Sequence, residues 1–426
     1  MEIRDPIHGS IELTPAETAV IDSAFFQRLR NIKQTGFAEF SFPGATHNRY
    51  CHSLGAMHLA GTAFDHIFRG FPFTSPAVRW RLRQTVRLAS LLHDVGHGPL
   101  SHTSEEVMPQ LSDLNIKIYG TKEKRRANHE DYTIKIITDS ELSPVLDKNF
   151  SDLSPKHVAL LIDKNLKEDD EFFIDNGINI RPLLSQIVSS ELDVDRMDYL
   201  TRDSYYCGTS YGHVDYDWLM ANLTYYRNED KLNLAVQRRA LYTFDDFLIS
   251  RYHMYLMVYF HHKSIIYEEM LMRYLSSDDC AFFLPGDIEE YIDCTDYALY
   301  QHLGQVDNEW AKRISERRIY RVLFELHSTG ETGRPEKIQR VLEDEGISVI
   351  PASSSIRLSK YHGGNSIEKN FPIYVVDLYD RLAKPYPIEQ STQIFQKYDE
   401  IRRIERLYVP PEQLARAEKI LISKKL

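Results

Sequence analysis

The stretch Val86-Arg-Leu-Ala-Ser-Leu-Leu-His-Asp-Val-Gly-His-Gly-Pro-Leu-Ser-His102 joins an apolar helical pattern to three histidines and an aspartate. The apolar spacing predicts a mostly buried helix, which the glycines and the proline then end. His93 and Asp94 fall at its inner end, where an imidazole and a carboxylate are costly to bury without a partner. A lone histidine would more often cap the helix or form a core hydrogen bond. Several such groups in one short stretch favour a divalent metal ion as the partner.

The composition around this stretch is that of an ordinary globular protein. The chain has 426 residues, 42% hydrophobic and 27% charged, enough for one large core or two domains. A net charge of −11 without a basic block argues against broad capture of nucleic acid, but it allows a small anionic ligand in a local basic pocket. The charged N-terminus and the lack of a long apolar run lead us to expect a cytoplasmic protein that does not associate with membranes. The four cysteines form no C-x-x-C pair, so we expect reduced, structural thiols.

The elements before the central stretch are a small hairpin and a helix. Residues 3–13 read as two short strands around a turn. Thr14-Pro15-Ala16-Glu17 has the form of a helix start, and the apolar face that follows continues to Ile32. Between residues 160 and 180 the chain is acidic and polar, which predicts a mobile insertion.

The second half of the chain changes character at a turn-rich linker. Residues 241–272 predict a long aromatic helix, and the linker follows at residues 328–335. Beyond it the pattern predicts strands at residues 347–350, 373–378 and 406–409, and a helix over residues 411–421. We therefore expect a mainly α fold in two domains, a helical core with an N-terminal β-hairpin over residues 1–327 and a smaller C-terminal α+β lobe over residues 328–426.

Two further stretches supply side chains that could bind the same metal ion. His52 lies in the first turn of a predicted helix beside Arg49, whose charge disfavours protonation and leaves the imidazole available as a ligand. Asp195 begins a polar stripe that continues at residues 198, 199 and 202 of another predicted helix. Such a stripe is either a salt-bridged surface or the wall of a polar pocket.

The combined set of His52, His93, Asp94 and Asp195 indicates hydrolytic chemistry. Nitrogen and oxygen ligands in this mixture suit an octahedral Mn²⁺, Fe²⁺, Co²⁺, Ni²⁺ or Mg²⁺ site better than a tetrahedral structural zinc site. Four protein ligands leave room for a phosphate oxygen and a water, which is what polarising a phosphorus centre requires. The pattern therefore predicts metal-assisted hydrolysis of a phosphoester or phosphoanhydride.

The same residues carry a resemblance to a known family. His52, His93-Asp94 and Asp195 resemble the ligand signature of the HD-domain phosphohydrolases. The stretches at residues 25–34, 42–55, 93–102 and 193–203 are similar to the deoxynucleoside triphosphate (dNTP) triphosphohydrolases, above all to the vertebrate members that couple an HD domain to a SAM domain. The resemblance covers nearly the whole chain. It implies hydrolysis of a dNTP to a deoxynucleoside and inorganic triphosphate, activation by a GTP or dNTP effector, and a homodimer or homotetramer.

The resemblance also implies roles for individual residues. It assigns the divalent metal ion (Mn, Fe, Mg, Ni, Co or Zn) to His52, His93, Asp94 and Asp195. It assigns catalytic roles to His97, His102, His129, Glu130 and Glu105. It assigns substrate binding to Gln34, Arg49, Arg196, Tyr199, Asp203 and Tyr259. It assigns effector binding to Asp22, Gln27, Arg30 and Arg321.

Three departures from the family pattern leave the base preference and the second, deoxynucleotide effector site open. Tyr255 differs from the family's residue near the substrate, and Thr35 and Phe260 differ from its residues at the base. Two other classes of function also stay open. One is another HD-type activity with the same metal, such as a nucleotide phosphohydrolase, a phosphodiesterase or a single-strand nuclease. The other is a binding protein in which nucleotide occupancy matters more than turnover.

Overall fold

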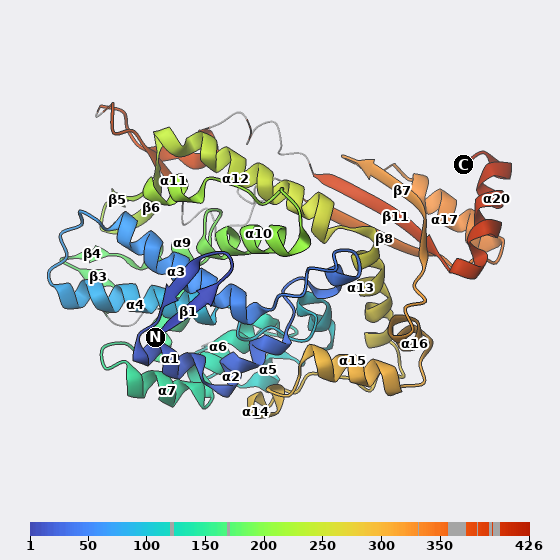
Figure 1. Cartoon of the computed structure of the whole chain (residues 1–426), viewed down its shortest axis with the longest axis horizontal. Coiled ribbons are helices and arrows are strands. Elements are labelled where there is room, and N and C mark those ends of the chain that lie inside the picture. Colours follow the sequence, from blue (N-terminus) through green and yellow to red (C-terminus); the bar gives the residue numbers. More distant parts are fainter. Residues whose placement is uncertain are drawn as a thin grey trace.

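The apolar stretch before His93 forms α4 (Pro76–Leu92), which Ser75 caps and whose second half is buried. We describe it from a computed structural model that covers residues 1–119, 123–167, 171–330, 332–356, 372–380, 382–391, 394 and 401–426. Helix α4 packs against α3 (Arg49–Ile67), and α3 packs against α10 (Val194–Cys207) (Figure 1). These three helices form the centre of the molecule. The start of α3, the end of α4 and the start of α10 lie close together. Among the described residues, no helix combines the length and apolar character that crossing a membrane would need.

Further helices surround this centre and bury its apolar faces. On α4 lie α8 (Pro155–Ile162) and α9 (Arg181–Val188), and α6 (His129–Asp139) packs against α8. The largest buried apolar cluster runs through all six of these helices. The other α-helices that the structure describes are α1 (Pro15–Ile21), α2 (Ala24–Gln27), α5 (Leu111–Leu114), α7 (Leu142–Asn149), α11 (Tyr216–Ala221), α12 (Leu241–Met254), α13 (His262–Leu275), α14 (Ile288–Tyr291), α15 (Asp296–Gln305), α16 (Glu309–Ser315), α17 (Arg334–Asp344) and α20 (Leu414–Lys424).

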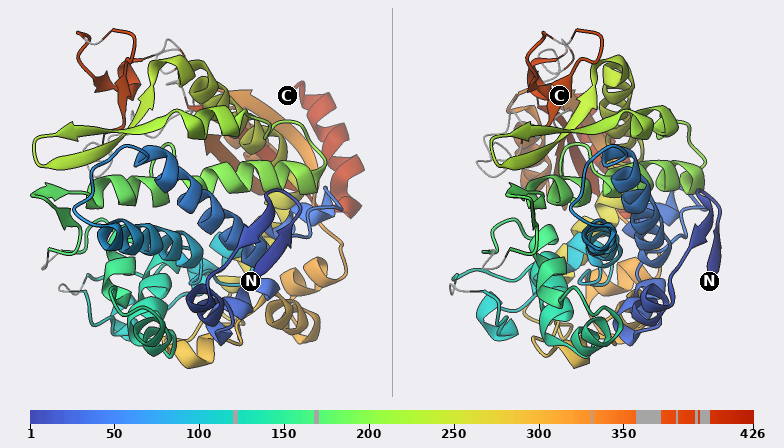
Figure 2. Two further views of the ribbon diagram at one scale, coloured as in Figure 1. Left: turned by 60° about the vertical axis from the view of Figure 1, so that its left-hand side comes forward. Right: turned by 90° about the vertical axis from the view of Figure 1, so that its left-hand side faces the viewer.

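The strands in the described part of the chain form three small sheets. The predicted hairpin is present as β1 (Glu2–Asp5) and β2 (Gly9–Glu12), which pair antiparallel and lie on the outer side of the helical core (Figure 2). A second sheet has the order β10-β9-β6-β4-β3, with β5 paired to β6. Its strands are β3 (Ile174–Asp175), β4 (Ile178–Asn179), β5 (Leu223–Asn228), β6 (Lys231–Gln237), β9 (Tyr374–Val376) and β10 (Tyr386–Pro387). A third sheet contains β7 (Arg321–Ser328), β8 (Ile350–Ile356) and β11 (Arg402–Val409). The mainly α fold class with small sheets is thus confirmed.

The C-terminal region joins the helical core through strand pairing. Strand β7 pairs antiparallel with β11, and the three-stranded sheet with α17 and α20 occupies one end of the long axis in Figure 1. Strand β9 pairs parallel with β6. Both pairings join residues before the proposed division at 327/328 to residues after it: β7 to β11 in one sheet and β6 to β9 in another.

Two predicted helices are interrupted in the structure. The helix predicted from Pro15 to Ile32 breaks at Ser23, whose side chain caps α2, and ends in a 3₁₀ turn. The helix predicted over residues 241–272 becomes α12, a π-helical turn at Tyr255–Tyr259, and α13. The middle of the predicted acidic insertion, residues 168–170, lies outside the described residues.

A glycine allows α3 and α10 to approach closely. A Cβ added at Gly55 would lie 1.9 Å from Oδ1 of Asp198 and 2.5 Å from Nη2 of Arg202. We expect Gly55→Ala to lower the free energy of unfolding by about 1–3 kcal/mol, because overpacking forces the helices apart. At Gly304 of α15 a Cβ meets no atom within 4 Å. Gly304→Ala should therefore raise the free energy of unfolding by up to about 1 kcal/mol, because alanine has a higher helix propensity than glycine. Urea unfolding of both variants checks the opposite signs.

Candidate metal centre

Three side chains from the ends of the central helices converge on one point. His52 comes from the first turn of α3, His93 follows α4 directly, and Asp195 lies in the first turn of α10. Nε2 of His52 lies 3.0 Å from Oδ1 of Asp195, Nε2 of His93 lies 3.4 Å from the same oxygen, and the two nitrogens are 3.4 Å apart. A cation about 2.1 Å from each ligand produces separations of this size. The three atoms therefore form one face of a metal site.

The partners of the other imidazole nitrogens fix the two rings in the orientation that metal binding needs. Nδ1 of His93 donates to the backbone carbonyl of Ser90 at 2.8 Å, so the proton of a neutral His93 resides on Nδ1. Nδ1 of His52 faces Oδ2 of Asp198 at 2.8 Å. Both Nε2 lone pairs are consequently available toward Asp195, as in metal-binding histidines held by a second hydrogen bond. This chemistry fits a divalent metal ion.

Asp94 lies beside the three-residue cluster and links it to a cation. Its oxygens are 3.4 Å from Nε2 of His93 and 3.6 Å from Nε2 of His52, and it forms an ion pair with Arg49. Although burial favours the neutral acid, the charge of Arg49 and the nearby histidines hold the pKa of Asp94 well below its usual value. The structure thus brings all four predicted ligands together.

The ring of His52 strongly attracts a positive charge. Burial alone would lower its pKa, but hydrogen bonds with Asp195 and Asp198 outweigh burial and raise the pKa to about 10. A proton therefore occupies this place when no cation is bound, and metal binding must release it. The carboxylates of Asp195 and Asp198 thus favour a positive charge here, either a proton on His52 or a bound metal ion.

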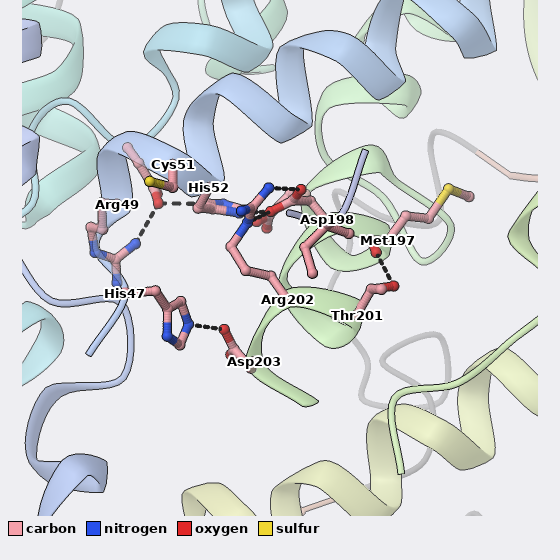
Figure 3. Close-up of polar contacts among 12 residues, drawn as sticks. His47, Arg49, Cys51, His52, Met197, Asp198, Thr201, Arg202 and Asp203 are labelled. Atoms are coloured by element: carbon pink, nitrogen blue, oxygen red, sulfur yellow. Dashed lines mark hydrogen bonds and ion pairs between the residues drawn. The ribbon is translucent and has the colours of Figure 1, made fainter. Parts of the chain in front are cut away.

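Asp198 is a part of the centre that the sequence did not identify as a site residue. It contacts both His52 and Arg202 (Figure 3), with Nε of Arg202 at 2.8 Å from Oδ2. Nε2 of His8, from the turn of the N-terminal hairpin, donates to Oδ1 at 2.6 Å. Asp5 of the same hairpin binds the other side of Arg202 at 2.9 Å. The hairpin therefore helps to hold the carboxylate that orients His52.

We expect His8→Ala to weaken metal binding by up to about 10-fold, the lower end of the effect of removing a ligand's own hydrogen-bond partner, because His8 acts on His52 only through Asp198. Titration of EDTA-treated protein with Mn²⁺ would measure it. His58→Ala provides the matched control, because the ring of His58 lies only 5.5 Å from that of His8 and contributes no ligand. Equal losses in both variants would show that the hairpin merely packs against α3.

A cavity of about 540 Å³ opens next to this centre and receives most of the predicted site residues. His93, Asp94 and Asp195 form part of its wall, while His52 lies buried behind them. Of the predicted catalytic residues, His97, His129 and Glu130 line it. All six predicted substrate residues line it, namely Gln34, Arg49, Arg196, Tyr199, Asp203 and Tyr259.

The histidines beside the metal centre form a stacked pair. The rings of His97 and His129 are 3.9 Å apart between centroids, and Nδ1 of His129 lies 2.6 Å from Oε1 of Glu105. Burial and the charge of Arg49 lower the pKa of His97 well below its usual value. A carboxylate thus lies beside each ring, because Nε2 of His97 is 3.2 Å from Oδ1 of Asp94 and Glu105 holds His129. His102 follows in the 3₁₀ turn Ser101–Val107, and its side chain lies outside the described part of the structure.

Asp203 connects two other walls of the cavity. Its Oδ2 accepts from the hydroxyl of Tyr259 at 2.7 Å, and its Oδ1 lies 2.7 Å from Nε2 of His47. Burial and the nearby carboxylate raise the pKa of Tyr259 well above its usual value, so the hydroxyl keeps its proton. Sequence reasoning missed His47, although it falls within a stretch that carries the family resemblance. Arg196 is held by Asp193, the N-cap of α10.

The predicted effector residues lie outside the cavity. Nε of Arg30 donates to Oε1 of Gln27 at 2.7 Å, and the guanidinium lies 3.6 Å from the ring centre of Tyr50. Asp22 is exposed at the end of α1. Arg321 is exposed at the start of β7 in the three-stranded sheet. The structure thus brings Gln27 and Arg30 together and places Arg321 on a different element.

Comparison with known proteins gives two family matches and several relatives. An HD domain matches residues 49–203, and an HD associated region matches residues 214–341. The chain is 30% identical to an uncharacterized protein of Methanocaldococcus jannaschii, over 76% of the chain and 59% of that relative. It is 31% identical to the deoxynucleoside triphosphate triphosphohydrolase SAMHD1 homolog of Dictyostelium discoideum, over 76% of the chain and 60% of that relative. The chain thus spans about three fifths of the length of these two relatives. A crystal structure of a hypothetical protein from Aquifex aeolicus matches 99% of both chains, with a TM-score of 0.75 and 28% identity.

Proposed function

The chain belongs to the HD-domain hydrolases, and from that premise we propose that it is a metal-dependent dNTP triphosphohydrolase. The observation that carries the proposal is the convergence of two imidazole Nε2 atoms and a carboxylate oxygen at the wall of a cavity that also contains Arg49 and Arg196. Two cations beside a divalent metal site suit a polyphosphate. The likeness to the Dictyostelium relative, which is named for this activity, supports the choice of a dNTP.

The proposed reaction breaks one bond between phosphorus and oxygen. Water attacks the α-phosphorus, the bond to the 5′-oxygen breaks, and that oxygen takes a proton, which yields a deoxynucleoside and inorganic triphosphate. A divalent metal ion held by His52, His93, Asp94 and Asp195 would polarise a phosphate oxygen and lower the pKa of water.

The protein's own residues bind, orient and move protons in this proposal. Arg49 and Arg196 bind the phosphates. His129, supported by Glu105 and stacked on His97, lies at the cavity wall where a proton can pass to the leaving oxygen. By family resemblance, His102 would donate the proton to the leaving oxygen. Glu130 would belong to the catalytic cluster with His97 and His129.

The sugar and an effector complete the proposal. Tyr199 and Tyr259 lie edge to face with ring centroids 6.4 Å apart, and with Gln34 and Asp203 they form the part of the wall proposed to bind the sugar. By resemblance, Asp22, Gln27, Arg30 and Arg321 would bind a GTP or dNTP effector in a homodimer or homotetramer.

Product analysis tests the proposal. Purified protein with Mn²⁺ or Mg²⁺ is given each dNTP alone, and then with GTP or a second dNTP. We expect deoxynucleoside and triphosphate in equal amounts, and a rise in rate with the second nucleotide. Monophosphate with pyrophosphate would contradict the proposed bond cleavage and favour another nucleotide phosphohydrolase. Turnover of oligonucleotides alone would favour the nuclease alternative.

A further inference from the structure

The carboxylate of Glu268 on α13 lines the cavity. Ser264, Ile265 and Glu268 share the face of α13 that lines the cavity. Among the described residues Glu268 has no hydrogen bond or ion pair, whereas its neighbour Glu269 is paired with Arg273 at 2.7 Å. Burial and the charge of Glu269 raise the pKa of Glu268 to about 7. The protein therefore holds an acidic group in a place where its own residues do not stabilise the charge.

Other polar atoms around the same cavity also have no partner in the part of the chain that the structure describes. Oε1 of Gln34, Oγ1 of Thr35 and Oγ of Ser264 are buried without a hydrogen bond among the described residues. The segment that carries Thr35 is fixed to α13, because Phe37 stacks on Tyr267 at 5.1 Å. Buried polar atoms normally have partners. Several unpaired oxygens around one cavity indicate that a ligand supplies the missing hydrogen-bond donors.

The charges in the cavity separate the two ends of such a ligand. The metal ligands and both arginines come from α3, α10 and the loop after α4, whereas α13 approaches from the side of the three-stranded sheet (Figure 1). Phosphates belong with the arginines and the metal centre. A carboxylate would repel phosphates, but it accepts hydrogen bonds well from N–H groups. The α13 side is consequently suited to the base of the nucleotide.

We propose that Glu268, together with Ser264 and Thr35, determines base specificity and selects guanine. Guanine carries two adjacent donors, N1–H and the 2-amino group, which match the two oxygens of one carboxylate. Thymine places two carbonyl oxygens beside its single N–H, and adenine and cytosine place an acceptor nitrogen beside their amino group. This inference rests on the proposed function, since it names the dNTP that the same cavity prefers.

Binding and turnover of matched nucleotides test the inference separately from the proposed function. Binding of dGTP, dITP and dTTP to the full-length protein in EDTA is measured by calorimetry, so that no turnover occurs. We expect dGTP to bind about 10- to 100-fold more tightly than dTTP, with dITP between them because hypoxanthine lacks the 2-amino group. Glu268→Gln should remove most of this difference. Glu269→Gln, which deletes the same charge one residue away, should retain it.

The ratio of kcat/KM for dGTP and dTTP with Mn²⁺ should follow the same pattern in the three proteins. Equal binding of dGTP and dTTP by the unaltered protein, or an unchanged ratio in Glu268→Gln, would overturn the role of Glu268. Absence of triphosphate release with any dNTP would refute the proposed reaction, and the binding measurement would still decide the base specificity. Melting temperatures within a few degrees of one another would establish that both glutamine variants fold.

Discussion

Asp195→Ala is expected to abolish hydrolysis, with a loss of at least about a thousandfold, equivalent to about 4 kcal/mol of activation free energy. Among the described residues, Oδ1 of Asp195 is the one carboxylate oxygen within 3.4 Å of both Nε2 atoms, so its removal leaves the two imidazoles with Asp94 as the remaining predicted carboxylate ligand. Mn²⁺ affinity should fall together with activity. Activity assays and Mn²⁺ titration of the same preparations measure both effects.

Asp217→Ala provides the control for this prediction, because Asp217 is exposed on α11 and the substitution is identical. EDTA treatment of the unaltered protein should reproduce the loss seen in Asp195→Ala, and added Mn²⁺ should restore only the unaltered protein. Retention of activity by Asp195→Ala, with normal Mn²⁺ binding, would refute the assignment of the metal centre.

Sequence patterns predicted the fold class and the neighbourhood of the site because both depend on strong local signals. The apolar period before His93 identifies a buried helix. Helix α4 ends at Leu92, in agreement with the glycines that follow at positions 96 and 98. Cap signals located the start of α1 at Pro15. Ligand chemistry grouped His52, His93 and Asp195 in the sequence and the family resemblance supported the grouping, because helical periodicity alone says nothing about how three helices cross.

Other features depend on tertiary contacts that leave little local signal. Ser23 interrupts a continuous apolar pattern, and only the direction of the chain in the structure shows that it caps a new helix. Strand β9 pairs with β6, which lies about 140 residues earlier in the chain, and no turn sequence encodes that pairing. Asp198 was visible in the polar stripe of α10, but its role became clear only with the hairpin residues His8 and Asp5 around it. Glu268 was missed because one acid next to a second acid, Glu269, resembles a solvated charge even on a helix as aromatic as this one.

The network around Asp198 should make it the most sensitive of these sites for stability. Arg202 is fully buried, and its guanidinium is held by Asp198 on one side and Asp5 on the other. Asp198→Asn keeps the shape but removes the negative charge, which leaves a buried guanidinium with one carboxylate instead of two. We expect the free energy of unfolding to fall by about 3–5 kcal/mol, the usual loss when one member of a buried ion pair is removed. Urea unfolding in EDTA measures it without a contribution from metal binding.

Asp65→Asn is the surface control, because Asp65 likewise pairs with more than one basic side chain, Arg79 at 2.5 Å and Arg83 at 2.8 Å, but does so at the surface. Its side chain is 40% exposed, whereas that of Asp198 is 0% exposed. Water screens the exposed pairs, so the same substitution there should cost less than about 1 kcal/mol. Similar losses at the two positions would mean that burial does not set the strength of the Asp198 network. A large loss at Asp198 alone would show that the charge holding His52 in place also holds α10 to the N-terminal hairpin.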